Sequence, residues 1–321
     1  MLFLNHADVE AVGLELSDVV EIVAATLAAK AAGAVELPPK LGLAPREGAV
    51  LHAMPARVGE AIGIKWISSF PGNRQRGLPP TTGLIVLNDA QTGIPSAVLD
   101  ADWTTTARTG AVAAVAARHL AVANPQVAAI VGPGRIGAAA LRALRLVLPL
   151  RLARAWAPRA ETAQRFAREL GAEASPTLEE AVRGADVIIT AAPWPGGAGF
   201  ARDGRSAVRR VASNSGPPSI RPEWIAPGAF ACALDYDASF TPAAIARFDV
   251  RVADDVAQMD VARAKGSFGE WPRFSELCEA KRKQEEQRIV CAALGLALFD
   301  VAVATRVLEA ARKRGIGREV N

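Results

Sequence analysis

Cysteine and histidine are scarce in this chain of 321 residues, which contains three of each. No two cysteines form a CxxC pair, so neither a disulfide framework nor a structural zinc site is expected. The histidines are scattered along the chain, which argues against a histidine-based metal site and against a serine triad. We therefore expect no bound metal and a reducing, cytoplasmic location.

Long apolar runs are also missing. The longest apolar stretch, 290–308, is interrupted by Asp300 and Arg306, so no segment is expected to span a membrane. The first residues lack the basic start and the apolar run of a signal peptide. Half of the residues are hydrophobic and 22% are charged, which is the balance of a soluble globular protein.

Lysine and aromatic residues are few. The chain has seven lysines against thirty arginines, and only 5% of its residues are aromatic. The net charge of +4 is dispersed, so nucleic-acid binding is not expected. A GC-rich genome would produce the arginine bias without any function. In so lysine-poor a chain, however, a lysine in an apolar setting stands out.

The first third of the sequence has the pattern of a mixed α+β domain. Helical spacing covers 18–32, and the apolar residues of 63–70 predict a strand. Two further apolar runs, 83–88 and 94–99, flank a short glycine-containing connection, which predicts an antiparallel hairpin. A helix of small residues is predicted over 104–123.

Strands and helices alternate from residue 127 onward. This alternation predicts an α/β fold with a Rossmann-type doubly wound parallel sheet. The expected strands are 127–131, 151–156, 186–190, 210–213 and 229–234. One helix is expected after the first strand and ends near 147, and two more cover 160–170 and 177–182. A last helix, predicted over 289–312, is too apolar to stand alone. We expect it to pack on the N-terminal part, which makes that α+β domain discontinuous.

A glycine-rich turn connects the first of these strands to its helix. In the GxGxxG pattern, Gly132 permits the tight turn, Gly134 lets the backbone approach a pyrophosphate, and Gly137 allows close packing of helix on strand. The N-terminus of the following helix offers free N–H groups and positive potential to phosphates. The pattern in this context predicts a bound dinucleotide.

The acidic residue that binds the ribose 2′-hydroxyl of NAD is missing. It is expected about twenty residues after the glycines, but 138–160 contains neither Asp nor Glu. Ala157 occupies the expected position, and Arg159 follows closely. A guanidinium without a carboxylate suits a 2′-phosphate, which favours NADP over NAD. The alternative is that the arginines of this region are solvated surface residues.

Two cationic residues lie in apolar surroundings. Lys65 interrupts an apolar strand, where a buried ammonium is costly unless it is paired or faces a ligand. Arg108 begins a helix of alanine and valine, where its guanidinium could bind a carboxylate at two points. A purely structural salt bridge is the alternative for Arg108.

The ordered motifs around these residues resemble the ornithine cyclodeaminase/mu-crystallin family, and the resemblance covers most of the chain. The motifs are His52-Ala53-Met54-Pro55, Lys65-Trp66, Gly72-Asn73, Gly77-Leu78-Pro79, Leu87-Asn88-Asp89, Thr92-Gly93, Asp100-Ala101, Arg108-Thr109-Gly110-Ala111 and the glycine turn. The resemblance implies a dimeric enzyme with two domains. Residues 1–122 and 293–321 would form the substrate and dimerisation domain, and 123–292 the NAD(P)-binding Rossmann domain.

The resemblance also implies roles for individual residues. Lys65 matches the active-site lysine of the family and Asp237 its catalytic aspartate. Arg108 matches the arginine that binds the substrate carboxylate, Thr82 a threonine that contacts substrate, and Lys40 replaces the usual early arginine. The expected cofactor-binding residues are Gly132, Gly134, Arg135, Ile136, Gly137, Arg159 and Thr109.

The sequence departs from the family pattern near the catalytic aspartate. Asp235-Tyr236 stand where the family has Gly-Gly or Gly-Ser, so the acid/base role falls on either Asp235 or Asp237. In the glycine turn, Arg135-Ile136 replace small or amide residues. These departures bear on the identity of the substrate more than on the fold.

The resemblance implies hydride transfer between a nicotinamide and the α-carbon of a small amino or imino acid, as in an imine reductase or an amino-acid dehydrogenase. The first alternative is an ornithine cyclodeaminase, which forms proline and ammonia with catalytic NAD. The second is a non-catalytic nucleotide-binding protein of the crystallin kind.

Overall fold

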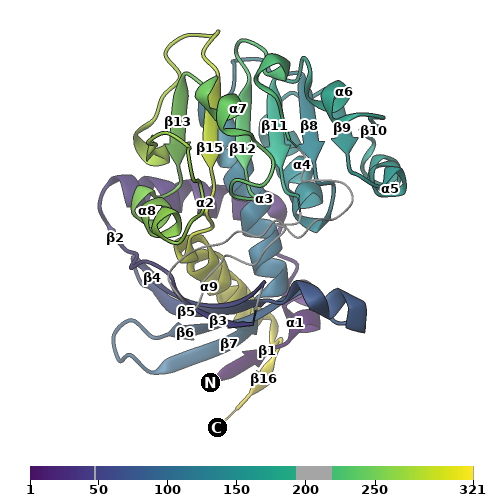
Figure 1. The fold of residues 1–321 in the computed structure, drawn as a ribbon. Coiled ribbons are helices and arrows are strands. Elements are labelled where there is room, and N and C mark those ends of the chain that lie inside the picture. The colour runs from purple at the N-terminus through teal and green to yellow at the C-terminus, as the bar shows by residue number, and fades with distance from the viewer. Residues whose placement is uncertain (47, 193–218, 321) are drawn as a thin grey trace. The chain divides into compact units, whose positions relative to one another are not determined.

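The computed structural model describes residues 1–46, 48–192 and 219–320, which form two compact units (Figure 1). Among these residues, the first unit combines 1–108 with 296–320, and the second combines 109–192 with 219–295. The division falls inside helix α3 (Asp102–Leu120). Domain boundaries at 122/123 and 292/293 stay a prediction.

The first unit contains a mixed sheet in the order β16-β1-β7-β6-β5-β4-β2, with β3 paired to β4. Only β1 and β7 run parallel among these neighbours. The predicted hairpin is confirmed, since β6 and β7 pair antiparallel. The strands are β1 (Leu2–Leu4), β2 (Val35–Glu36), β3 (Leu41–Arg46), β4 (Ala49–Val58), β5 (Ala61–Ser69), β6 (Thr81–Asn88), β7 (Pro95–Asp100) and β16 (Arg318–Glu319).

Both ends of the chain contribute helices to this unit. They are α1 (His6–Val12), α2 (Leu16–Ala31), the short η1 (Pro71–Arg76) and α9 (Ala297–Arg314). Helix α9 packs against β4, β5 and β6 and also contacts α1 and α2, so its apolar residues are buried on several sides. This packing explains why the first half of the helix, up to Ala304, is apolar almost all round.

The prediction of one helix over 289–312 is wrong at its start. Residues Ile289–Ala292 form strand β15 of the second unit, and Gly295, in the left-handed region with φ 77°, precedes α9. A buried parallel strand and a buried helix both present continuous apolar runs, so periodicity does not separate them.

The second unit contains a parallel sheet in the order β10-β9-β8-β11-β12-β15-β13-β14. The strand order reverses between β8 and β11, which is the switch point of a doubly wound sheet. The predicted fold class is confirmed, while the strand predicted at 210–213 lies outside the described residues. The strands are β8 (Val127–Val131), β9 (Leu152–Trp156), β10 (Glu173–Ala174), β11 (Val187–Thr190), β12 (Phe230–Ala233), β13 (Val250–Ala253), β14 (Ser275–Glu276) and β15.

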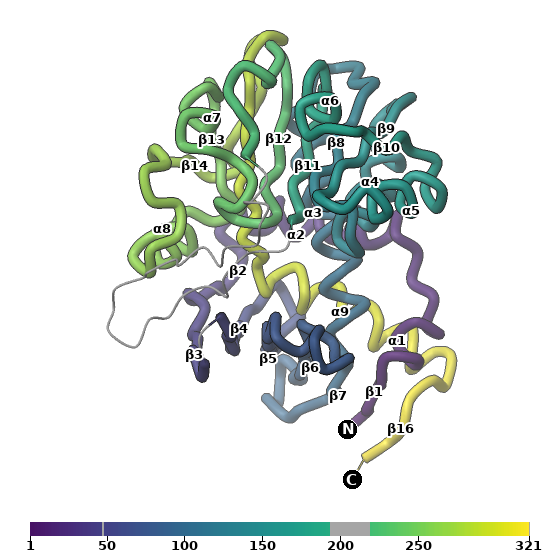
Figure 2. The backbone as a smooth tube through the Cα atoms, turned by 45° about the vertical axis from the view of Figure 1, so that its right-hand side comes forward, coloured from purple at the N-terminus to yellow at the C-terminus, as the bar shows by residue number. Residues whose placement is uncertain are grey.

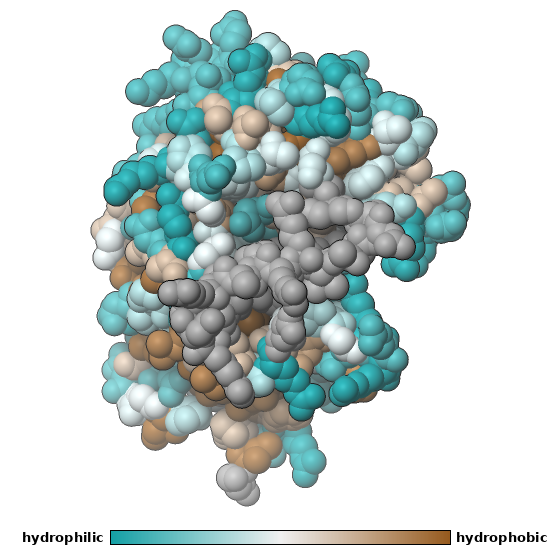
Figure 3. Space-filling view, in the orientation of Figure 1, coloured by the Kyte–Doolittle hydropathy of each residue, from teal (hydrophilic) through white to brown (hydrophobic). Residues whose placement is uncertain are grey.

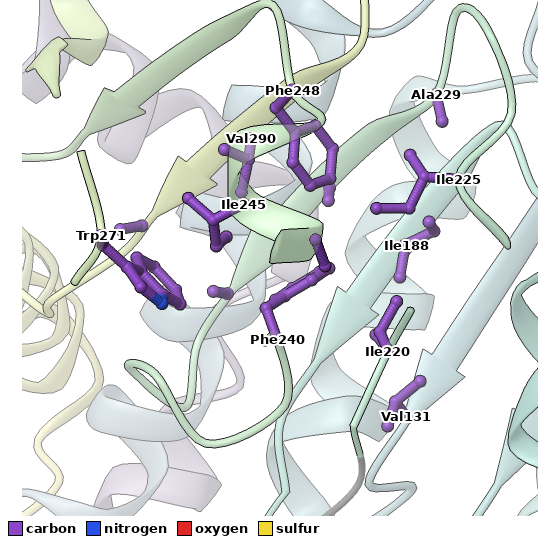
Figure 4. Close-up of a cluster of buried hydrophobic side chains, with 14 of the residues drawn as sticks. Val131, Ile188, Ile220, Ile225, Ala229, Phe240, Ile245, Phe248, Trp271 and Val290 are labelled. Atoms are coloured by element: carbon purple, nitrogen blue, oxygen red, sulfur yellow. The ribbon is translucent and has the colours of Figure 1, made fainter. Parts of the chain in front are cut away.

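Helices flank this sheet, as the tube in Figure 2 shows for α4, α5 and α6 beside β8 and β9. The helices are α4 (Arg135–Val147), α5 (Ala160–Leu170), α6 (Leu178–Val182), α7 (Pro242–Ala246), α8 (Val256–Ala264) and the short η2 (Pro222–Trp224) and η3 (Leu277–Glu279). On one face of the sheet, Ile188 and Val290 pack with Ile245 and Phe248 into a buried core (Figure 4). This core fixes the strands whose ends carry the glycine turn. In the described part of the chain, no helix is long and apolar enough to cross a membrane.

Candidate functional site

A buried cluster of three charged residues lies in the first unit. Strand β5 contributes Lys65, α9 contributes Asp300 and α3 contributes Arg108. Lys65 Nζ lies 2.6 Å from Asp300 Oδ2, and Arg108 Nε donates to Asp300 Oδ1 at 2.9 Å. The side chains of Lys65 and Asp300 are 1% and 0% exposed. One carboxylate thus lies between two cations, which leaves the cluster with an excess positive charge and suits it to an anionic ligand.

The cluster shifts the pKa of its members in opposite directions. Burial lowers the pKa of Lys65 to about 7, with smaller contributions in the same direction from Arg108 and Lys40 and an opposing one from Asp300. For Asp300, burial alone would raise the pKa, but Arg108 and Lys65 outweigh it and hold the pKa below its ordinary value. Lys65 can therefore exchange a proton near neutral pH, whereas Asp300 stays ionised.

The sequence pointed to Lys65 and Arg108 but not to their partner. Asp300 is the only acidic residue between positions 290 and 308, and a lone carboxylate in such an apolar run is itself a signal of a buried pair. Its partners are 192 or more residues away in the chain, so no local spacing could reveal the pairing.

Lys40 and Thr82 lie in the same unit, but only Lys40 acts on the charged cluster. Lys40, between β2 and β3, acts on the Lys65 ammonium through its charge. Thr82, on β6, is the residue that pairs with Ser68 of β5, and its Oγ1 lies 3.0 Å from Ser68 Oγ. Side chains alternate between faces along a strand, so Ser68 and Thr82 lie on the face opposite to that of Lys65. The structure thus does not bring Thr82 to Lys65; Thr81 shares the Lys65 face.

The glycine turn of the second unit has the geometry that a dinucleotide requires. Gly132 has φ 87°, and a Cβ there would lie 2.5 Å from backbone atoms of Ala191 and Ala192. A Cβ at Gly137 would lie 2.7 Å from the carbonyl oxygen of Gly132, so the helix could not approach the strand. At Gly134, by contrast, a Cβ would meet no described residue within 4 Å, and this residue caps the start of α4 without a side-chain hydrogen bond.

The open N-terminus of α4 therefore fits a pyrophosphate. Its first turn contains no acidic residue, and Arg135 and Gly134 are exposed beside the partly buried Ile136. Unpaired N–H groups at a helix start, together with the helix dipole, bind anions. Thr109, in α3, is the first residue of this unit and is partly buried.

The arginines near the expected ribose position divide into two kinds. Arg145 donates to the carbonyl oxygens of Leu170 and Gly171, and Arg154 donates to that of Arg183 at 3.0 Å. These two guanidinium groups fasten neighbouring segments. Arg159, just after β9, is exposed at the start of α5.

The two candidate acids differ in their surroundings. Asp235 is buried and accepts hydrogen bonds from Thr190 Oγ1 (2.6 Å), Ser239 Oγ (2.6 Å) and the Ala192 N–H (3.0 Å). Asp237 is only partly buried, and its Oδ2 accepts from the N–H of Phe268 at 2.7 Å. The more accessible Asp237 is better suited to proton exchange with a ligand, and its catalytic role stays a prediction.

Metal ligands are not gathered anywhere in the described residues: no group of three or more His, Cys, Asp or Glu side chains could hold an ion there.

The doubly wound sheet with its glycine turn is typical of dinucleotide-binding enzymes. The chain belongs to the ornithine cyclodeaminase/mu-crystallin family, and the match to the family covers residues 1–315. The family expected from the sequence motifs is thus confirmed.

Several relatives match along most of their length. An alanine dehydrogenase from Archaeoglobus fulgidus is 30% identical over 339 residues, covering 99% of this chain and 98% of that protein. A Δ(1)-pyrroline-2-carboxylate reductase from Bacillus cereus is 27% identical over 275 residues, or 81% of each chain. The structure of an archaeal alanine dehydrogenase dimer with bound NAD has a TM-score of 0.83 at 29% identity, covering 100% of this chain and 99% of that one.

Proposed function

We propose that this protein is an NAD(P)-dependent oxidoreductase that transfers hydride between a nicotinamide and the α-carbon of a small amino or imino acid. The observation that carries the proposal is the buried Lys65–Asp300–Arg108 cluster, in a chain that also contains a dinucleotide turn. The similarity to an alanine dehydrogenase and to a Δ(1)-pyrroline-2-carboxylate reductase supports it, because these relatives are named for an amino acid and for a cyclic imino acid.

The substrate carboxylate is assigned to Arg108. Asp300 engages Nε, at the base of the guanidinium, which orients the terminal nitrogens for two-point binding. One helical turn earlier, the Thr104 hydroxyl is buried and has no hydrogen-bond partner among the described residues, which favours a polar ligand beside Arg108. The charge of Lys40 adds to the attraction for an anion.

Proton transfer at the substrate nitrogen is assigned to Lys65. Its ammonium would donate a proton during imine reduction, and the neutral amine would accept one during amino-acid oxidation. Asp237 is the second proton-transfer group, on the prediction from the family motif. The dinucleotide, when bound at Gly132, Gly134 and Gly137, supplies or accepts the hydride.

The test of this function combines two readouts. The protein is incubated with NADPH or NADH and a panel of imino acids, cyclic and linear, and with ornithine and NAD. Absorbance at 340 nm and released ammonia are then measured. Stoichiometric oxidation of the cofactor supports the proposal. Ammonia release from ornithine without net change in cofactor would instead establish the cyclodeaminase, and binding of cofactor without any turnover would establish a non-catalytic protein.

NADPH is the proposed cofactor in preference to NADH. The support is the absence of an acid at the end of β9 and the exposed guanidinium of Arg159 close behind it. The similar archaeal alanine dehydrogenase holds NAD, so this preference would distinguish the two proteins. We expect Arg159→Ala to weaken NADPH binding about tenfold, the effect of losing one charge-assisted hydrogen bond, and to leave NADH binding unchanged. Titration calorimetry with both cofactors checks this; equal losses for both would refute the 2′-phosphate role.

A homodimer is the proposed assembly, with a cytoplasmic location predicted from the sequence. The face of the first sheet turned away from Lys65 carries exposed apolar side chains on neighbouring strands, namely Leu41, Leu43, Trp66 and Leu84. Hydrophobic side chains gather over this unit in Figure 3. Such a patch is typical of an interface, and the similar alanine dehydrogenase is a dimer.

This assembly predicts the molecular mass in solution. Light scattering is expected to give twice the mass of one chain for the wild type, and Trp66→Glu is expected to give the mass of a monomer because it places charge in the patch. Trp224→Glu, which changes a partly buried tryptophan of the second unit, serves as the control and should remain dimeric. A monomeric wild type would exclude the proposed interface.

A further inference from the structure

Asp235 joins the ends of two neighbouring strands. It follows β12, yet two of the three hydrogen bonds that it accepts from other described residues come from the end of β11: Thr190 Oγ1 donates to Oδ1, and the N–H of Ala192 donates to Oδ2. Ser239 Oγ supplies the third bond from its own loop. With 4% of its surface exposed, Asp235 is not open to solvent. Its carboxylate therefore holds the peptide that follows β11 in one place.

That peptide forms one wall of the glycine turn. A Cβ added to Gly132 would lie 2.5 Å from the carbonyl carbon of Ala191 and from the nitrogen of Ala192. The N–H of Ala191 also donates to the carbonyl of Val131, directly before the turn, at 2.8 Å. The position of the Ala191–Ala192 peptide and the conformation of Gly132 thus depend on each other.

We propose that Asp235 is a positioning residue for the dinucleotide, holding the Ala191–Ala192 peptide against Gly132 so that the turn keeps the shape that receives a pyrophosphate. This inference rests on the proposed function, because it requires that the turn bind NAD(P). It gives Asp235 a role distinct from that of Asp237, at the carboxyl ends of the strands where ligands of doubly wound sheets bind.

The ionisation of Asp235 makes the contact sensitive to pH. Burial raises the pKa of Asp235 to about 6, against the opposing effect of its hydrogen bonds. The groups that face it are the hydroxyls of Thr190 and Ser239 and the N–H of Ala192, with no charged side chain among these partners. A protonated, neutral carboxyl accepts hydrogen bonds from these donors more weakly than a carboxylate does, because bonds to an ionised acceptor are the stronger ones. Cofactor affinity is therefore expected to fall as the pH falls through about 6.

Loss of binding at low pH would not reflect unfolding through this group. The pKa of Asp235 is higher in the folded chain than its ordinary value, so between the two values the folded state binds more protons than the unfolded state. Protonation of Asp235 consequently favours the folded chain in that window. Binding and stability respond to acid in opposite directions here, which separates the two effects.

The experiment measures the dissociation constants of NADPH, the proposed cofactor, and of NADH by calorimetry between pH 5.5 and 8. For Asp235→Asn we expect the dissociation constants to increase about tenfold or more at pH 8, because hydrogen bonds to a charged acceptor are lost. We expect these constants to change little further with pH. Asp186→Asn is the matched control: Asp186 also accepts backbone N–H groups, from Gln126 and Val127, but it lies before β11, at the end of that strand opposite to Thr190. It should lower thermal stability without changing the dissociation constants.

A second variant keeps the test decisive if Asp235→Asn does not fold. Ser239→Ala removes one donor that lowers the pKa of Asp235, so the midpoint of the pH dependence should move upward. Unchanged affinity for both cofactors and an unchanged midpoint in the variants would overturn the positioning role while leaving the proposed function intact. A wild-type chain that binds neither NADH nor NADPH would overturn the proposed function and this inference with it.

Discussion

Asp300→Ala is expected to lower the free energy of unfolding by about 3–5 kcal/mol, the cost of removing one partner from a buried ion pair. The carboxylate lies 2.6 Å from the ammonium of Lys65 and 2.9 Å from the guanidinium of Arg108. Without it, the two buried cations lose the counter-charge that they share. Denaturant unfolding at pH 6, followed by fluorescence, measures the loss.

The pH dependence of this loss follows from the lowered pKa of Lys65. That pKa is about 7 in the folded chain and 10.5 ordinarily, so between the two values the unfolded state binds more protons and stability rises with pH. The Asp300→Ala variant can neutralise Lys65 more easily, because Asp300 is the group that raises its pKa. The destabilisation should therefore be smaller at pH 9 than at pH 6.

A double-mutant cycle tests whether the paired charges cause the effect. In a Lys65→Met background, the Asp300→Ala change should cost clearly less than it costs alone, since only Arg108 then loses its counter-charge. Asp300→Asn, which keeps the shape of the side chain and removes its charge, should resemble Asp300→Ala rather than the wild type. Equal costs of Asp300→Ala in both backgrounds would show that packing dominates over charge.

The fold of the second unit could be predicted from the sequence because its elements are local and regular. Apolar runs such as Val127–Val131, followed by a glycine turn and an amphipathic helix, carry their own signal. The run near 289 has no such signal, since a strand and a helix follow one another without a polar break. Short strands such as β13 and β14 were missed because they depend on pairing with distant neighbours.

The site was predictable one residue at a time but not as a cluster. Lys65 and Arg108 stand out as cations in apolar elements, whereas their meeting at Asp300 depends on how α9 packs over β5. The face of a strand residue is equally hard to assign, because a shift of one position moves Thr82 to the far side of the sheet from Lys65. Likewise, two aspartates two residues apart, Asp235 and Asp237, differ only through their tertiary contacts.

Lys65→Met is expected to reduce the turnover number by about 10²–10⁴-fold, the usual contribution of a positioned acid or base. Imine reduction requires a protonated nitrogen, so the reductive rate of the wild type should fall as the pH rises through about 7, the pKa of Lys65. The oxidative rate, which requires a neutral base, should rise over the same range. Among the described residues, the charged groups that act on Lys65 are Asp300, Arg108 and Lys40, and burial together with these groups sets this midpoint.

Profiles of rate against pH, measured in both directions, decide the assignment. In Lys65→Met the limb of each profile near pH 7, which is the fall of the reductive rate and the rise of the oxidative rate, should disappear. Asp300 keeps Arg108 as its partner, so the variant should remain folded. Arg108→Lys is the contrasting variant: it keeps the positive charge but loses two-point binding of a carboxylate. It should raise the KM of the amino or imino acid and retain the limb near pH 7. If Lys65→Met kept that limb, the proton would have to come from another group and the assignment to Lys65 would be refuted.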